Sequence, residues 1–286
     1  MPQTQPAGAA TVRLLVLGKR LRDLRVAADK SFEDAAAALG VSPLAIRRME
    51  QGQVKWKPPY IKLLLEEYGV SAAEAKTFLE LSAEANQPGW WYRYRDVLPD
   101  WFRAFVSLEE EASLIRAYEP HYIPGLMQTE EYARTVLRAG LKDNDEIERR
   151  VRLRMERQHR LLQPGGLELW VVMDETVLRR PVAPAAVMRE QIDRLIDIVA
   201  LPNVTLQVIP FALYVHEGMY GPFHSFRFPF PELQDIVYVE TVLGSFYVDQ
   251  YPDVTAFSEA LDRMSALAPP PQRTEAILGA IRKEIN

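Results

Sequence analysis

The chain has 286 residues, of which 48% are hydrophobic and 26% charged, and it contains no cysteine. This length favours two domains, and the composition is that of a globular protein with a sizeable core. Without cysteine, disulfides and cysteine-ligated zinc or iron–sulfur sites are excluded. No stretch approaches the roughly 20 apolar residues that span a bilayer, and residues 1–11, which we expect to be a disordered arm, lack a signal-peptide pattern. We therefore expect a cytoplasmic protein without membrane contact.

The formal net charge of −5 is unevenly distributed along the chain. Residues 12–62 contain eleven Lys/Arg and five Asp/Glu, a net charge of +6 that leaves −11 for the remainder. Binding to a polyanion needs a basic face rather than a basic protein as a whole. The asymmetry therefore favours nucleic-acid binding by this segment, although a solvated charged helix would also produce it.

Residues 12–86 are predicted to form a domain of five helices. Leucines recur at spacings of three and four in the first helix, which places them on one side. The second helix is predicted to begin after Ser31, a good N-cap, and to end before Gly40, a residue type that tolerates the left-handed conformation. The third is predicted to begin after Ser42 with Pro43 at its first position, where the missing N–H has no cost.

The segment that joins the second and third helices carries a resemblance. Its sequence is LGVSPLAIRRMEQG, residues 39–52, which resembles the turn and recognition helix of phage-repressor-like regulators of the Xre family. The resemblance implies that the third helix enters a DNA major groove and that Glu50 braces the domain against a basic residue of the first helix, such as Arg20. The predicted DNA-binding residues are Ser42, Pro43, Leu44, Ala45, Arg47, Arg48, Lys55 and Lys57.

Two residues depart from the family pattern. Many relatives carry glutamines at the start of the second helix and just inside the third, where this chain has Glu33 and Pro43. Base reading would then depend largely on Arg47 or Arg48, whose guanidinium can bind guanine O6 and N7 for about 1–3 kcal/mol of discrimination. The alternative for the helix-turn-helix is a fold that is used only for protein contact. The alternative for Lys55 and Lys57 is that they are solvated charges of a loop.

From Pro88-Gly89 onward the composition changes, and we expect a C-terminal domain at residues 87–286. Helices are predicted from Ser107, from Thr129, over 145–162, around 186–199, and near 253–267 and 272–285. Strands are predicted at Leu167–Met173, Val204–Ile209, Phe223–Phe228 and Ile236–Thr241. The expected fold class is α+β: an all-α, five-helix, phage-repressor-like helix-turn-helix domain followed by a mixed α/β domain with a small sheet.

The resemblance extends into this second domain. It is carried by PHYIPGLMQTEEYAR (120–134), MERQHRLL (155–162), VVMDETVLRRPV (171–182) and LQVIPF (206–211), with GWWYRYRD (89–96) between the domains. These segments are similar to those of bacterial two-domain, antitoxin-like Xre regulators. The similarity implies a transcriptional regulator that is commonly paired with a small neighbouring protein, and it supplies no known ligand.

Three groups of residues are candidates for binding a partner or ligand in the second domain, and each has a structural alternative. Trp90, Trp91, Tyr92 and Tyr94 suggest an aromatic recognition surface or ligand cage, or else side chains that pack the joint between the domains with Arg93 and Arg95 stacked on them. Tyr122, Pro124, Gly125 and Gln128 suggest a partner or effector surface, or else a turn. His216 and His224 suggest a metal site or acid–base pair, or else a polar loop at a small-molecule pocket.

The combined prediction is a homodimeric DNA-binding regulator that recognises a palindromic operator in double-stranded DNA. Its C-terminal domain would respond to a protein partner or a small-molecule effector. The main alternative is an antitoxin-like interaction protein whose chief role is to bind a small partner encoded next to it. An enzyme with a DNA-targeting head would rest only on the two histidines, and because no catalytic motif occurs, we expect no enzymatic activity, no cofactor and no metal.

Overall fold

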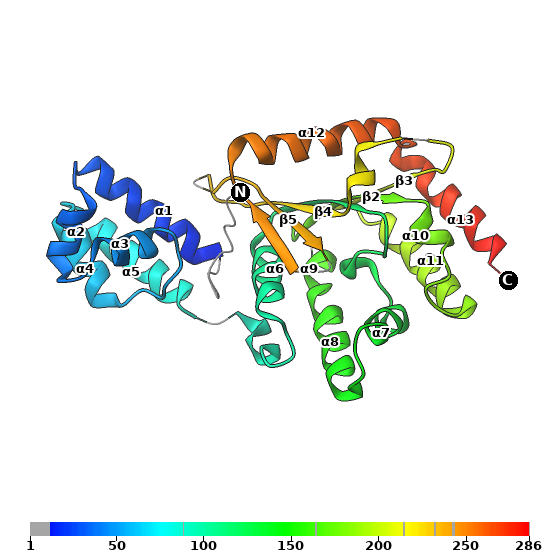
Figure 1. Cartoon of the computed structure of the whole chain (residues 1–286), viewed down its shortest axis with the longest axis horizontal. Coiled ribbons are helices and arrows are strands. Elements are labelled where there is room, and N and C mark those ends of the chain that lie inside the picture. The colour runs from blue at the N-terminus through cyan, green and yellow to red at the C-terminus, as the bar shows by residue number, and fades with distance from the viewer. Residues whose placement is uncertain are drawn as a thin grey trace. The chain divides into compact units, whose positions relative to one another are not determined.

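The computed structural model describes residues 12–87, 89–163, 165–213, 215–231, 233–241 and 244–285, so the expected arm at residues 1–11 lies outside the described residues. The chain divides into two compact units (Figure 1). The first contains the described residues up to Arg95 together with Pro99–Glu111 and Pro229–Gln234, and the second contains Asp96–Leu98, Ala112–Phe228 and the described residues from Asp235 onward.

The first unit begins with the five expected helices. They are α1 (Val12–Ala27), α2 (Phe32–Leu39), α3 (Pro43–Glu50), α4 (Pro58–Glu67) and α5 (Ala72–Ala85), followed by the 3-10 helix η1 (Trp90–Tyr94) and by α6 (Asp100–Glu111). The five helices share a core to which each contributes apolar side chains, and Leu21, Ile46, Ile61 and Leu64 are fully buried in it. Burial of this apolar surface is what holds such short helices in place, because isolated helices of this length are marginal in water.

The ends of α2 and α3 follow from local chemistry, as predicted. The Ser31 hydroxyl accepts a hydrogen bond from the Asp34 amide at 3.1 Å, and the Asp34 carboxylate accepts one from the Ser31 amide at 2.9 Å, which completes a capping box. Gly40 ends α2 in the left-handed conformation with φ 63°. The Ser42 hydroxyl caps α3 by accepting a hydrogen bond from the Ala45 amide at 3.3 Å.

Helix α1 approaches the end of α3 very closely, and two glycines permit this. A Cβ added to Gly18 would lie 2.8 Å from the carbonyl carbon of Glu50 and closer still to its oxygen. Gly52, which follows α3 with φ +65°, lies against the backbone of Leu14, where a Cβ would come within 2.9 Å. At positions of this kind a side chain has no room, so the sequence needs glycine.

A buried ion pair joins the same two helices. Arg25 of α1 donates to both carboxylate oxygens of Glu50, at 2.6 and 3.0 Å, and the two side chains retain only 8% and 3% of their exposure. The predicted brace between Glu50 and the first helix is therefore present, but its bidentate partner is Arg25 rather than Arg20. Gly18, in the middle of α1, lies against the backbone of Glu50, and Arg25 follows it by about two turns, so Arg25 lies on the same side of α1 and reaches the carboxylate.

The second unit is built on a mixed sheet. The six strands found in the described residues are β1 (Leu114–Glu119), β2 (Glu168–Asp174), β3 (Val204–Ile209), β4 (Phe223–Arg227), β5 (Ile236–Thr241) and β6 (Gly244–Val248). Their order is β3-β2-β1-β4-β5-β6. β1, β2 and β3 are parallel neighbours, whereas β4, β5 and β6 pair in antiparallel fashion.

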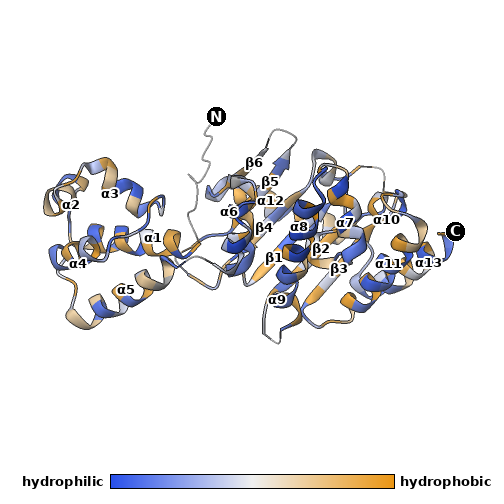
Figure 2. Cartoon of the chain, turned by 90° about the horizontal axis from the view of Figure 1, so that it is seen from below, coloured by the Kyte–Doolittle hydropathy of each residue, from blue (hydrophilic) through white to orange (hydrophobic). Residues whose placement is uncertain are grey.

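Helices connect the parallel strands, because such strands need a long crossover. The helices of this unit are η2 (Gly125–Met127), α7 (Glu130–Arg138), α8 (Asn144–Arg157), α9 (His159–Leu162), α10 (Thr176–Arg179), α11 (Ala185–Val199), η3 (Glu217–Tyr220), α12 (Tyr251–Leu267), η4 (Pro271–Arg273) and α13 (Thr274–Glu284). In Figure 1, α12 runs along one face of the sheet and α7 and α8 lie on the other side. In Figure 2 the central strands are mainly hydrophobic, and the side of α8 turned toward the viewer is mainly hydrophilic.

The α+β class is confirmed, because an all-helical N-terminal region is followed along the chain by a unit with a small mixed sheet. The four predicted strands are present with ends shifted by at most one residue, whereas β1 and β6 were not predicted. The prediction of a helix capped by Ser107 is wrong, because Ser107 lies inside α6 and is followed by β1. The helix expected over 145–162 divides into α8, which Asp143 caps, and α9. In the part of the chain that the structure describes, no helix is long and apolar enough to cross a bilayer.

We expect Gly18→Ala to destabilise the helix-turn-helix unit by about 1–3 kcal/mol, because the added methyl group would push α1 away from the backbone of α3. Gly279→Ala in α13 is the matched control. A Cβ there meets nothing within 4 Å, so replacing a helical glycine should stabilise the protein by about 0.5–1 kcal/mol. Equilibrium denaturation of both variants measures the difference, and equal stabilisation by both would contradict the close contact.

Candidate nucleic-acid interface

Helix α3 buries one face and presents the other to solvent. Ile46, Met49 and Glu50 are buried. The predicted DNA-binding residues lie on the opposite side: Ser42, Pro43, Leu44, Arg47 and Arg48 are exposed and Ala45 is half-buried. Leu44 retains 56% of its exposure, which is high for a large apolar side chain that no other part of the unit covers. This face therefore exposes residue types that can contact phosphates and base edges.

The two arginines of this face are available for an external acceptor. In the described residues, no carboxylate lies within ion-pair distance of Arg47 or Arg48, although other arginines of the chain have such partners. The Arg47 guanidinium lies 5.2 Å from the ring centroid of Phe32, at the start of α2. A guanidinium without a carboxylate partner keeps its donors for base edges or phosphates.

The loop after α3 is held by Trp56. This side chain is 2% exposed and stacks on Phe78 of α5, with ring centroids 5.8 Å apart. The Asn86 side chain accepts a hydrogen bond from the Trp56 amide at 3.1 Å and donates one to the Trp56 carbonyl at 2.8 Å. The buried position of Trp56 was not predicted from the sequence. The feature that could have indicated it is a single tryptophan between two lysines.

Trp56 places Lys55 and Lys57 at the surface on either side of it. Both lysines are exposed. The Lys55 ammonium lies 3.4 Å from the Asn86 carbonyl oxygen, and that of Lys57 lies 5.3 Å from the ring of Tyr60. Neither contact neutralises the charge, so both ammonium groups suit contacts with phosphate oxygens.

The N-terminus of α2 is acidic. Glu33 is exposed, and hydrogen bonds from the Ser31 hydroxyl and amide hold the pKa of Asp34 below its usual range. Carboxylates stabilise a helix N-terminus through its dipole, but they repel a phosphate at the same place. The start of α2 is therefore a poor phosphate site, in agreement with the departure from the family pattern at Glu33.

The four aromatic candidates of η1 do not share one environment. Trp91 and Tyr94 are buried, and the Trp91 indole N–H donates to Glu110 at 3.0 Å. Trp90 and Tyr92 keep 37% and 45% of their exposure. Arg95 lies 4.3 Å from the Tyr92 ring and Arg93 lies 5.3 Å from the Tyr94 ring, which is the arginine stacking that the structural alternative predicted.

The candidates at residues 122–128 are mostly occupied by the fold itself. Gln128 is 3% exposed, donates to the Ile123 carbonyl at 2.6 Å and accepts from Arg154 at 2.8 Å. Pro124 is buried and Gly125 opens η2. Tyr122 keeps 45% of its exposure and is the member of this group that faces solvent.

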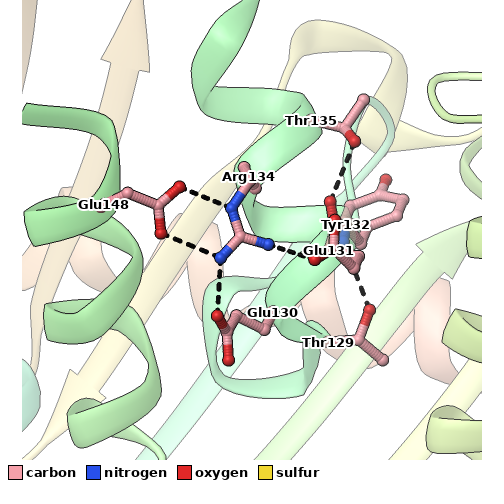
Figure 3. Close-up of polar contacts among 7 residues, drawn as sticks. All are labelled: Thr129, Glu130, Glu131, Tyr132, Arg134, Thr135 and Glu148. Atoms are coloured by element: carbon pink, nitrogen blue, oxygen red, sulfur yellow. Dashed lines mark hydrogen bonds and ion pairs between the residues drawn. The ribbon is translucent and has the colours of Figure 1, made fainter. Parts of the chain in front are cut away.

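The motif that follows these residues ties α7 to α8 (Figure 3). The Thr129 hydroxyl caps α7 by accepting from the Tyr132 amide at 3.3 Å. Arg134 donates to both carboxylate oxygens of Glu148 on α8, at 2.6 and 2.9 Å, and also pairs with Glu130 and Glu131 of its own helix. These partners raise the pKa of Arg134. The network therefore stabilises the packing of α7 against α8.

His216 and His224 do not form one site. His216 packs edge-on against Tyr118 with ring centroids 5.7 Å apart, and its Nε2 lies 3.6 Å from Asp174. Tyr118 pairs with Phe223, so His224, the next residue of β4, points to the opposite face of the sheet. The hypothesis of a joint metal or acid–base site at these two histidines is therefore wrong.

His224 instead pairs with Glu119 on the face away from Tyr118. The His224 Nε2 lies 3.3 Å from a Glu119 carboxylate oxygen, and the side chains keep only 16% and 14% of their exposure. Burial raises the pKa of Glu119 to about 8, and the nearby charge of Glu240 acts in the same direction. Burial also lowers the pKa of His224 to about 4, helped by the charge of Arg157. Removal from water disfavours the charged form of each group.

Comparison with known families gives two matches along the chain. A helix-turn-helix domain matches residues 16–78, which contain α2, the turn and α3. A domain of unknown function, DUF5753, matches residues 102–280, more than half of the chain. The chain belongs to the DUF5753 family. The DUF5753 match contains every described strand of the sheet. No curated protein and no solved structure matches the chain.

The chain therefore has the two-domain architecture of a helix-turn-helix regulator, with a DUF5753 domain after the DNA-binding domain. A helix-turn-helix domain suggests DNA binding and transcriptional regulation. The narrower resemblance to antitoxin-like Xre regulators stays a prediction.

Stability should fall as the pH rises from 6.5 to 8, because unfolding lets Glu119 ionise while burial keeps it protonated in the fold. A group whose pKa is raised by folding stabilises the fold below its unfolded pKa and loses that effect as pH rises through the folded value. In Glu119→Gln this part of the slope, at most about 1.4 kcal/mol per pH unit, should disappear. His224 acts at lower pH, where its depressed pKa makes stability fall as pH falls from 6.5 to 4.

Thermal unfolding at several pH values measures the slope. Glu168→Gln, which removes an exposed carboxylate at the start of β2, is the matched control and should keep the wild-type slope. A Glu119→Gln slope equal to that of the wild type would show that the carboxyl group is not protonated in the fold.

Proposed function

We propose that the chain is a DNA-binding transcriptional regulator that binds a palindromic operator as a dimer. Its DUF5753 domain, on this proposal, responds to a protein partner or a small molecule. The observation that carries the proposal is the exposed face of α3. There the apolar side chain of Leu44 is exposed to solvent beside Arg47 and Arg48, which have no carboxylate partner in the described residues. The match of this segment to a helix-turn-helix domain supports the same conclusion.

In this proposal α3 lies in the major groove. Arg47 or Arg48 donates to guanine O6 and N7, and Leu44 contacts a thymine methyl group. Lys55 and Lys57 contact phosphates beside the groove and fix the register without reading sequence. The net charge of −11 outside residues 12–62 limits non-specific attraction to DNA, so base contacts matter more.

The small exposed surface of α3 supports the dimer. Helix α3 has eight residues, of which only one face is exposed. A surface this small covers one half-site, whereas specific operators are bound by two such helices about one helical turn apart.

A second candidate function is that of an antitoxin-like protein that binds a small partner encoded next to it. The segment around η3 supports it, because Phe211, Val215, Met219 and Tyr220 keep between 56% and 96% of their exposure. Exposed apolar side chains gathered in one segment are typical of a protein-binding surface. Co-expression with the neighbouring protein followed by gel filtration tests this candidate, and two proteins that elute separately would reject it.

Arg47→Ala should relax base preference at one position of each half-site and cost about 1–3 kcal/mol there. Lys55→Ala should instead weaken binding to all sequences and reduce the slope of log K against log salt by about one. Lys76→Ala is the matched control, because this lysine is exposed on α5, outside the proposed interface. Mobility shifts at several salt concentrations measure these effects, and a wild-type result for both interface variants would contradict the assignment of α3.

Selection of bound DNA from a random pool tests the dimer. We expect two-fold related half-sites whose centres lie about 34–36 Å apart, or a multiple of that distance. A selected site without internal symmetry would reject the dimer while leaving DNA binding intact. Repeating the selection with the neighbouring protein present shows whether that protein changes the affinity.

A further inference from the structure

A continuous series of contacts runs from the core of the helix-turn-helix unit to the exposed face of α3. It begins with buried Glu50, which binds Arg25, and the Arg25 guanidinium lies 4.1 Å from the ring centroid of Phe32. The Phe32 ring in turn lies 5.2 Å from the Arg47 guanidinium. Phe32 therefore connects a rigid, buried arginine to an exposed one.

The inner part of this series has little freedom. The Arg25 guanidinium donates twice to Glu50 and once to the Lys30 carbonyl, at 2.8 Å, and Arg25 as a whole is 7% exposed. Phe32 is the first residue of α2, directly after the capping box of Ser31, and it packs half-buried against the core. The ring is thus fixed by its backbone and by its neighbour.

The outer part has one partner. Among the residues that the structure describes, the Phe32 ring lies 5.2 Å from the Arg47 guanidinium, and no carboxylate lies within ion-pair distance of that guanidinium. An aromatic ring attracts the guanidinium but supplies no acceptor oxygen, so the N–H donors stay free for another acceptor. An exposed arginine loses much rotamer freedom when it binds a base, and a contact that restricts it beforehand reduces this loss.

We propose that Phe32 is a positioning residue that orients Arg47 for reading a base pair. The proposal rests on the proposed function, since it needs α3 to read DNA. On this proposal the Arg25–Glu50 pair not only joins α1 to α3 but also helps to orient Arg47, because Arg25 contacts the Phe32 ring on which Arg47 rests. The sequence gives no sign of the link, since the two residues lie fifteen positions apart on different helices.

The test compares Phe32→Leu, which removes the ring but keeps an apolar side chain, with Phe32→Tyr, which keeps the ring. The quantity measured is the ratio of the full chain's affinities for its selected site and for the same site altered at the base pair that Arg47→Ala affects. Phe32→Leu should reduce this ratio about two- to fivefold, the range expected for one exposed cation–π contact. Phe32→Tyr should leave it unchanged.

The same substitution in an Arg47→Ala background separates positioning from general damage. There Phe32→Leu should not change the ratio further, and the salt slope should keep its value in every variant. A Phe32→Leu variant that weakens binding to both sites equally, or that lowers the ratio by the same factor without Arg47, would overturn the proposal. A wild-type chain that selects no DNA sequence at all would instead reject the proposed function.

A measurement on the unaltered chain covers the case in which Phe32→Leu does not fold. The Hδ protons of Arg47 should be shifted upfield by the ring current of Phe32 in the free protein. Chemical shifts equal to those of an unstructured arginine would overturn the proposal.

Discussion

The position of α3 against α1 depends on one buried ion pair. Arg25 lies in the last turn of α1 and Glu50 is the last residue of α3, and their bidentate contact fixes these two parts of the helices against each other. Because both groups are removed from water, losing either one would leave an uncompensated charge inside the domain, at about 3–5 kcal/mol. The buried Tyr68 beside them has a raised pKa for the same reason, since burial and the negative charge of Glu50 disfavour its ionised form.

Much of the fold could be predicted because it is encoded locally. Caps, left-handed glycines and apolar periodicity fix helix ends within a few residues, as at Ser31 and Gly40. β1 escaped prediction because Arg116 and Glu119 interrupt its apolar pattern, and their partners come from distant parts of the chain, Asp262 and His224. β6 lies at the edge of the sheet and pairs with β5. Its side chains are half-buried or exposed, so its sequence lacks the apolar alternation that predicts a strand.

The candidate site was predictable only in part. The exposure of one α3 face follows from helical spacing. Ile46 and Met49 must face the core, so Arg47 and Arg48 must point to solvent. Which arginine of α1 meets Glu50 was not predictable, because it depends on how far α1 extends past α3 in the packed domain. The hypothesis of a joint histidine site failed for a similar reason, because closeness in sequence did not show that His216, which precedes η3, and His224 of β4 lie on opposite faces of the sheet.

The contact between Trp56 and Asn86 also links the proposed phosphate-binding lysines to the stability of the domain. It closes a loop of thirty residues that contains all of α4 and α5. Trp56 belongs to the apolar core that the five helices share, so the backbone of Lys55 and Lys57 is held by the same burial that stabilises these helices. A substitution that loosens the core at Trp56 would therefore also release the two ammonium groups from their places on the surface.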